Sequence, residues 1–259
     1  MKVKKYLISI QEPGEKRYEQ FFSQESFEKS EFTKYGVIGK RISTDQYFNL
    51  AVKNKIRALT PSELGCTLSH LSALRDFVDS DADYAFIFED DVITKKKIDF
   101  NLNLNFLGSN FILSLGGVSQ SVCHKVRGKI LTTEYLGQKI LKVAPLFYED
   151  IVYAMGYVLD KEAAKKIILC HQKNLHVIDH WYIVLNAYPE VSYYMVDLLE
   201  HPEILTLNSE NSSIYDERNG HFLYNLKPKL FDFIIKFINY RFYKLKKRFG
   251  RLFNKSYKL

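Results

Sequence analysis

The sequence predicts an α/β domain with a mostly parallel central sheet, and three observations support this fold class. Short apolar segments alternate with segments in which apolar residues recur every three or four positions. The run Tyr84–Phe88 contains no polar residue, which is typical of a strand buried on both faces. Hydrophobic residues make up 46% of the 259 positions, enough for a large core and too many for a disordered chain. Strands and helices that alternate in this way favour an α/β sheet.

Short apolar runs bounded by turn-forming residues predict the strands. In chain order they are Lys4–Ile10, Gly36–Ile42, Tyr84–Phe88, Phe111–Leu115 and Ile151–Leu159. The apolar run after the charged N-terminus is too short for a signal peptide. No stretch approaches the ~20 apolar residues of a membrane-spanning helix. We therefore expect a cytoplasmic protein without a span.

Helices are predicted between these strands. Gly14–Glu28 is polar with spaced aromatic residues, which fits a helix. Thr60 can cap a longer helix, because Pro61 suits the first helical position and Glu63 completes a capping box. A further helix is predicted from Lys161 to about Cys170, directly after the last strand.

Charge divides the chain into a body, 1–226, and a basic tail, 227–259. The tail holds 11 Lys and Arg and one acid, Asp232, a net charge of +10. Because the whole chain carries +7, the body carries −3. Apolar residues of the tail fall at spacings of three and four: Phe231, Ile234, Ile238, Phe242, Leu245, Phe249 and Leu252. This pattern predicts a basic amphipathic helix suited to a membrane surface, and the alternatives are packing on the body or an oligomer contact.

The three cysteines, Cys66, Cys123 and Cys170, are widely spaced and odd in number. They form neither a disulfide framework nor a CxxC metal motif. We expect buried free thiols in a reducing compartment.

The acidic triplet Glu89-Asp90-Asp91 follows the apolar strand directly. Ligands of open α/β sheets bind at the carboxyl ends of strands, and three carboxylates there call for a cation. Carboxylates suit Mg²⁺ or Mn²⁺, and alternate residues such as Glu89 and Asp91 can share one face. The alternative is a solvated acidic turn.

Two further segments carry weaker signals. Ser69 and His70 stand early in the helix that follows Thr60, where a histidine alone is more often a core residue than a functional one. Gly116 and Gly117 follow a predicted strand, where they form a turn or admit a ligand close to the backbone.

Two of these segments together resemble glycosyltransferase family 25, the bacterial lipooligosaccharide and lipopolysaccharide glycosyltransferases. They are Thr-Pro-Ser-Glu-Leu-Gly-Cys-Thr-Leu-Ser-His, which ends at His70, and Phe-Ile-Phe-Glu-Asp-Asp-Val, about 20 residues later. The resemblance spans roughly Tyr6 to Ile214. It implies a GT-A-like fold, a UDP-sugar donor (most often UDP-galactose), Mn²⁺ as the metal, and inversion at the anomeric centre.

Residue roles follow from the resemblance. Glu89 and Asp91 correspond to the outer acids of the metal-binding DxD motif, His201 to a late histidine that completes the metal site, and Asp90 to a donor contact. The donor or acceptor is expected to contact Ser9, Arg17, Ser69, His70, Asp90, Gly116 and Trp181. Ser9 departs from the family pattern, in which Asn-Leu is common at this point of the first strand.

Inversion requires a base that takes the acceptor proton. Asp179 is the preferred candidate, because the neighbouring Trp181 could stack on a sugar. Two alternatives stay open: Asp179 caps the next helix, and Trp181 is a core residue. Asp150 and Glu149 are the rival bases.

The sequence thus predicts a metal-dependent inverting glycosyltransferase that moves a hexose, foremost galactose, onto a lipooligosaccharide or lipopolysaccharide core. The tail is expected to hold it at the inner face of the bacterial inner membrane, and no nucleic-acid partner is expected. The alternative is a non-catalytic module that binds membrane or nucleic acid through the tail. A receiver-type phosphoacceptor domain fits less well, because its acidic pair follows the first strand.

Overall fold

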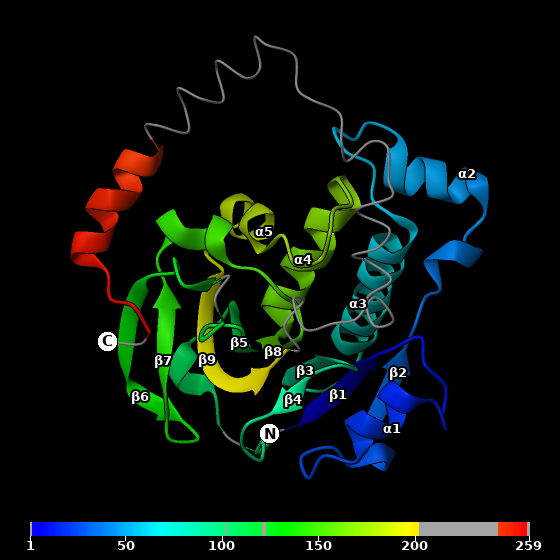
Figure 1. Ribbon diagram of the computed structural model, residues 1–259, viewed down its shortest axis with the longest axis horizontal. Helices are drawn as coiled ribbons and strands as arrows, with labels where there is room; N and C mark the ends of the chain where they lie inside the picture. The colour runs from blue at the N-terminus through cyan, green and yellow to red at the C-terminus, as the bar shows by residue number, and fades with distance from the viewer. Residues whose placement is uncertain (1, 102, 121–122, 202–242, 258–259) are drawn as a thin grey trace.

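The computed structural model describes residues 2–101, 103–120, 123–201 and 243–257. The described strands form one sheet in the order β2-β1-β3-β8-β5-β9-β7-β6, with β4 paired to β9 (Figure 1). The strands are β1 Val3–Ile8, β2 Phe32–Tyr35, β3 Tyr84–Glu89, β4 Ile93–Thr94, β5 Phe111–Gly116, β6 Gly128–Tyr135, β7 Gln138–Val143, β8 Gly156–Asp160 and β9 Ser192–Glu200. The helices are α1 Lys16–Phe22, α2 Thr44–Tyr47, α3 Pro61–Asp79, α4 Lys161–Lys173, α5 Trp181–Ala187 and a C-terminal helix over 243–253.

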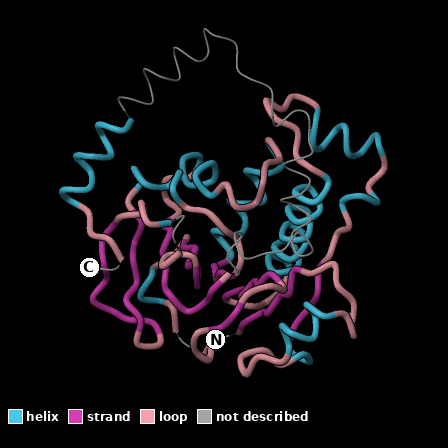
Figure 2. The backbone as a smooth tube through the Cα atoms, in the orientation of Figure 1, coloured by secondary structure: helices cyan, strands magenta, loops and turns pink. Residues whose placement is uncertain are grey.

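The sheet is mixed, but most of its strands run in one direction. Strands β1, β2 and β3 are parallel neighbours, and β9 is parallel to β5. Strand β8 lies antiparallel between β3 and β5, so these two run the same way. The hairpin β6–β7 extends the sheet beyond β9 at one edge (Figure 2). The α/β class is therefore confirmed.

Helices α3, α4 and α5 cover one face of the sheet, and α1 covers the other (Figure 1). Strand β3 contributes to both layers, because Ala85 and Ile87 face the first core cluster while Phe86 and Phe88 face the second. All four side chains are fully buried. Burial on both faces explains why this strand reads as an unbroken apolar run.

The capping box at the start of α3 is confirmed. The Thr60 hydroxyl accepts a hydrogen bond of 3.2 Å from the Glu63 amide, and the Glu63 carboxylate accepts one of 2.9 Å from the Thr60 amide. Arg57 also pairs with Glu63 at 2.9 Å, so the buried carboxylate is neutralised. Caps of this kind contribute about 1 kcal/mol and fix where the helix begins.

Two predicted strands were misplaced. Gly36–Ile42 is wrong as a strand, because β2 ends at Tyr35 and Gly39 begins a short 3-10 turn. A Cβ on Gly36 would lie 2.0 Å from the Ser9 carbonyl oxygen, and one on Gly39 would lie 1.7 Å from the Pro61 carbonyl oxygen. These glycines therefore serve close backbone crossings rather than a strand.

The strand predicted over Ile151–Leu159 begins only at Gly156. The cause is Tyr153, whose φ of 77° interrupts the extended chain. Left-handed backbone is rare for a residue with a Cβ, so the sequence gives no signal for this break.

The basic tail is helical over 243–253, and the predicted part from Phe231 to Phe242 lies outside the described residues. Lys247 is buried and pairs with Asp150, and Lys255 exchanges two backbone hydrogen bonds with Gly128 at 2.8 and 3.0 Å. The described tail therefore packs on the body. Within the described ranges, no helix combines the length and the apolar character needed to cross a bilayer.

Candidate active site

The predicted acidic site lies where β1, β3, β5 and β9 reach their carboxyl ends. This end of the strands is the acidic edge of the sheet. Ile8 is paired in register with Glu89, so Ser9 and Asp90 follow their strands at the same level. His201 comes directly after β9. Because the carboxyl ends of strands that run the same way meet at one edge, residues distant in sequence converge here.

Glu89, Asp91 and His201 converge as the sequence predicts. Each offers one ligand atom, and these atoms all lie within 4.8 Å of one another. His201 Nε2 lies 3.4 Å from Asp91 Oδ2, which also accepts a hydrogen bond of 3.1 Å from Arg17. Asp91 Oδ1 is buried and has no hydrogen-bond partner in the described part of the chain. Two carboxylates and an imidazole, with one buried oxygen still unbonded, fit a divalent cation.

The middle acid, Asp90, is buried. Its carboxylate accepts hydrogen bonds from the Ser9 hydroxyl and the Arg17 guanidinium. Burial raises the pKa of Asp90, although the Arg17 charge and the Ser9 hydrogen bond oppose this rise. Asp90 therefore anchors Arg17 and Ser9.

Asp91 behaves differently from Asp90. Burial acts to raise its pKa, but the hydrogen bond and charge of His201, together with the charge of Arg17, outweigh burial and lower it. Arg17 links both acids from α1, and its side chain is 35% exposed. The edge of the sheet thus holds the Asp91 carboxylate in its charged form beside a partly exposed guanidinium.

His201 is held in place by two contacts. Its ring stacks on Tyr153, with the ring centroids 5.1 Å apart. Its backbone carbonyl accepts a hydrogen bond of 2.8 Å from the side-chain amide of Gln120. The Tyr153 carbonyl in turn accepts a bond of 2.9 Å from the indole of Trp181. Tyr153 therefore joins a core residue to the histidine while its backbone keeps a strained conformation.

Ser69 and His70 lie on α3, which packs against the sheet beside the site, and both are buried. His70 Nε2 is 3.2 Å from Glu89 Oε1, so this histidine orients a site carboxylate. The Ser69 hydroxyl donates to the Gly65 carbonyl and accepts from the Val37 amide, both at 2.8 Å. Ser69 thus fastens the chain segment before Gly39 to the helix and has a structural role here.

Gly116 and Trp181 need correction. Gly116 packs against β9, because a Cβ there would lie 2.7 Å from the Leu199 carbonyl oxygen, so strand packing accounts for this glycine. The Trp181 side chain is fully buried, with its ring against Tyr157 and Tyr193. No sugar can stack on a buried indole, so Trp181 is a core residue.

The capping alternative for Asp179 is not supported, since α5 begins at Trp181 and His180 occupies the N-cap position. Asp179 lies close enough to Cys66 for its charge to add to the effect of burial and raise the pKa of that thiol. The rival Asp150 is paired with Lys247. Burial and the Glu149 charge raise the pKa of Tyr243, which places Glu149 beside the C-terminal helix as well.

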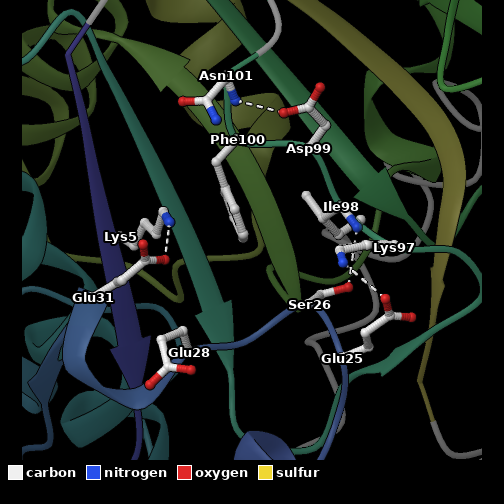
Figure 3. Close-up of a pocket in the computed structure, with 10 residues that line it drawn as sticks. All are labelled: Lys5, Glu25, Ser26, Glu28, Glu31, Lys97, Ile98, Asp99, Phe100 and Asn101. Carbon is white, nitrogen blue, oxygen red and sulfur yellow. Dashed lines mark hydrogen bonds and ion pairs between the residues drawn. The ribbon is translucent and has the colours of Figure 1, made fainter.

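A separate pocket of about 440 Å³ lies beside β1 and contains none of the predicted site residues (Figure 3). Both lysines of its lining are paired, Lys5 with Glu31 and Lys97 with Glu25. Lys5 also lies over the Phe100 ring, 4.1 Å from its centroid. These closed pairs leave the acidic edge of the sheet as the better candidate site.

The sequence interpretation did not include two residues that contact the site, Tyr153 beside His201 and Cys66 beside Glu89. Tyr153 carries no sequence signal, because only the folded backbone reveals its positive φ. Cys66 stands four residues before His70, a spacing that places both on one face of a helix. That spacing is a signal the sequence does hold.

Comparison with known proteins agrees with this geometry. The model for glycosyltransferase family 25, described as an LPS biosynthesis protein, matches residues 3–182. This match includes the acidic triplet and α3 and ends inside α5. No curated protein matches the chain significantly in sequence. Since the family match covers well over half of the chain, the protein belongs to glycosyltransferase family 25 and is a glycosyltransferase of LPS biosynthesis.

Proposed function

We propose that this protein transfers a hexose, foremost galactose from UDP-galactose, onto a lipooligosaccharide or lipopolysaccharide core acceptor. Transfer inverts the anomeric centre and depends on Mn²⁺ or Mg²⁺ in a GT-A-like fold. The observation that carries the proposal is the cluster of Glu89, Asp91 and His201, whose ligand atoms lie within 4.8 Å of one another. The family assignment supports the reaction class.

Glu89, Asp91 and His201 would hold the cation at the edge of the sheet. A divalent ion there would neutralise charge that develops on the departing diphosphate. Asp91 Oδ1 is the natural first ligand atom, because it is buried without a hydrogen-bond partner among the described residues. Glu89 is steadied by His70, which lies 3.2 Å away.

Arg17 is the residue best suited to the donor phosphates. Its guanidinium presents several N–H groups in a fixed fork, a geometry that matches phosphate oxygens. Ser9 donates a hydrogen bond to Asp90, and Asp90 in turn holds Arg17 from the buried side. Their contribution to donor binding is therefore to aim Arg17, while its exposed part faces the substrate.

Asp179 remains the preferred general base. It is only partly buried, whereas Asp150 is engaged by Lys247. Asp179→Asn should lower kcat by about 10²- to 10⁴-fold, because general base catalysis contributes that much. Binding of Mn²⁺ and UDP should be unchanged. A variant that retains full kcat would remove Asp179 from this role.

The C-terminal helix supports attachment to a lipid surface. Residues 243, 247, 250 and 254 face the body, as the pairing of Lys247 and the crowding of Gly250 against Leu146 indicate. The opposite face leaves four apolar side chains exposed by 51 to 84%: Leu245, Phe249, Leu252 and Phe253. Lys and Arg residues flank this face, and each basic residue near an anionic membrane contributes about 1 kcal/mol.

The transfer reaction is tested by screening UDP-sugars for hydrolysis with Mn²⁺ and with a chelator. We expect Mn²⁺-dependent release of UDP from UDP-galactose, which Asp91→Asn abolishes. Asp81→Asn is the matched control, because Asp81 is an exposed acid that pairs with Lys2 and lies outside the acidic cluster. Activity that survives chelation would refute the metal-dependent reaction, and inactivity with every UDP-sugar would favour a binding module.

The membrane surface is tested by co-sedimentation with vesicles of zwitterionic lipid, with and without anionic lipid. The full chain should sediment with anionic vesicles, and a variant with Phe249, Leu252 and Phe253 changed to Ser should remain in solution. Lys165→Ser is a control for general surface changes, since Lys165 lies on α4 and is exposed. Equal sedimentation of both proteins would contradict membrane attachment through this face.

A further inference from the structure

A second cluster of metal-ligating side chains lies between α3 and the carboxyl end of β3. Cys66 and His70 stand one turn apart on the same face of α3, and Glu89 reaches them from the end of β3. One atom from each residue lies within 4.8 Å of the other two. We propose that Cys66, His70 and Glu89 form a binding site for a thiophilic divalent ion such as Zn²⁺.

The distances between these atoms fit tetrahedral coordination. His70 Nε2 lies 3.2 Å from Glu89 Oε1, and Cys66 Sγ lies 3.8 Å from the same oxygen. An ion with bonds of about 2.0 Å to nitrogen and oxygen and about 2.3 Å to sulfur separates its ligand atoms by about 3.3 to 3.6 Å. These two separations lie within a few tenths of an ångström of the tetrahedral values, and all three ligand atoms lie within 4.8 Å of one another.

The second nitrogen of His70 is already held as metal-binding histidines require. His70 Nδ1 lies 2.9 Å from the Tyr157 hydroxyl. A phenol hydroxyl can both donate and accept, so its oxygen can accept a hydrogen bond from a protonated Nδ1. Without an ion, Nε2 carries the proton that it donates to Glu89. When an ion binds, the ring proton is held on Nδ1 instead, so Nε2 points its lone pair at the ion while Tyr157 fixes the ring.

Charge and access also favour a cation. The Cys66 thiol lies 3.8 Å from the Glu89 carboxylate, and Glu89 and Asp91 bring two acids to this end of the sheet. An ion with two positive charges would offset this concentration of negative charge and replace the thiol proton. Cys66 is partly exposed whereas His70 is fully buried, so the open fourth position lies on the Cys66 side.

The two clusters share Glu89, which gives the inner site a consequence for the reaction. A thiophilic ion that draws Glu89 toward Cys66 and His70 takes one ligand from the set that Asp91 and His201 complete. This consequence rests on the proposed function, whereas ion binding itself does not. Zn²⁺ is then an inhibitor that competes through a shared carboxylate, and Cys66 determines the sensitivity.

Cobalt titration of the full-length protein tests the site, because Co²⁺ bound to a thiolate gives a charge-transfer absorption in the near ultraviolet. The reduced wild-type protein should develop this absorption at one equivalent. Cys66→Ser should lose it, and Cys170→Ser, which changes another free thiol, should retain it. Tyr157→Phe should weaken cobalt binding about 10- to 100-fold yet keep the absorption at saturation.

The absence of a thiolate absorption in the wild-type protein, or its persistence in Cys66→Ser, would overturn the site. The wild-type spectrum alone can do so, which protects the test if a variant fails to fold. Given transferase activity, Zn²⁺ at fixed Mn²⁺ should inhibit Cys66→Ser at least about tenfold less than the wild type. Equal inhibition would overturn the competition, and an inactive protein with a normal cobalt spectrum would separate failure of the proposed reaction from failure of the site.

Discussion

Replacement of Arg17 by Met tests how the edge of the sheet tolerates its acids. Arg17 pairs with Asp90, whose side chain is only 4% exposed, and with Asp91. Removal of one partner of a buried ion pair costs about 3 to 5 kcal/mol, because the other charge stays buried and unpaired. Since the Arg17 side chain keeps 35% of its surface exposed, water screens the pair, and we expect a loss of about 2 to 3 kcal/mol.

The free energy of unfolding, from urea denaturation, measures this loss. Arg17→Met combined with Asp90→Asn should regain most of it, because the more deeply buried of the two charges that Arg17 pairs with is removed as well. Burial already raises the pKa of Asp90, so a carboxyl deprived of Arg17 loses folded-state stability as pH rises. The deficit of Arg17→Met should therefore grow from acidic to neutral pH. A single variant as stable as the wild type, or a double variant no better than the single one, would refute the buried ion pair.

Two further predictions concern His201 and His171. Tyr153→Ala should weaken Mn²⁺ binding about tenfold, because the ring that stacks on His201 is lost. Tyr153→Phe keeps a ring and should bind Mn²⁺ normally. Titration calorimetry of the two variants distinguishes these outcomes. Burial and the nearby His176 lower the pKa of His171 to about 2 in the folded protein. In the unfolded chain this histidine takes up a proton near its ordinary pKa of about 6.5, so acid below that pH favours unfolding. From about pH 7.5 to pH 5.5 the wild type should lose about 1.4 kcal/mol through His171, and His171→Leu should lose correspondingly less in denaturant titrations. Parallel pH profiles of the two proteins would contradict this assignment.

The site was predictable where it depends on strand direction. An apolar strand that ends in Glu89, Asp90 and Asp91 places these acids at the ligand-binding edge of an α/β sheet. His201 was expected beside them from the family resemblance, and the end of β9 brings it there.

The site was not predictable where it depends on packing between distant segments. Arg17 belongs to a helix on the other face of the sheet from α3, and only the folded chain brings its side chain to Asp90 and Asp91. Trp181 looked suitable for sugar stacking, but burial depends on what packs around it. The strained φ of Tyr153 is likewise a result of its surroundings.

Strands β6 and β9 were not predicted from the sequence, and the reasons differ. In β6, exposed polar residues such as Lys129 and Glu134 dilute the apolar pattern, because this strand lies at the edge of the sheet. In β9, by contrast, the run Tyr193–Val196 is apolar and buried, a strand signal that the sequence interpretation did not use. The hairpin and β9 extend the sheet on the side that carries His201 and receives the C-terminal helix.

Binding of Mn²⁺ tests most directly the central claim that Glu89, Asp91 and His201 hold a divalent cation. Electron paramagnetic resonance of free Mn²⁺, recorded with UDP present, reports the bound fraction. We expect one Mn²⁺ per wild-type chain, binding at least about tenfold weaker in Asp91→Asn, and wild-type binding in Asp81→Asn. Equal binding by Asp91→Asn and the wild type would contradict the account.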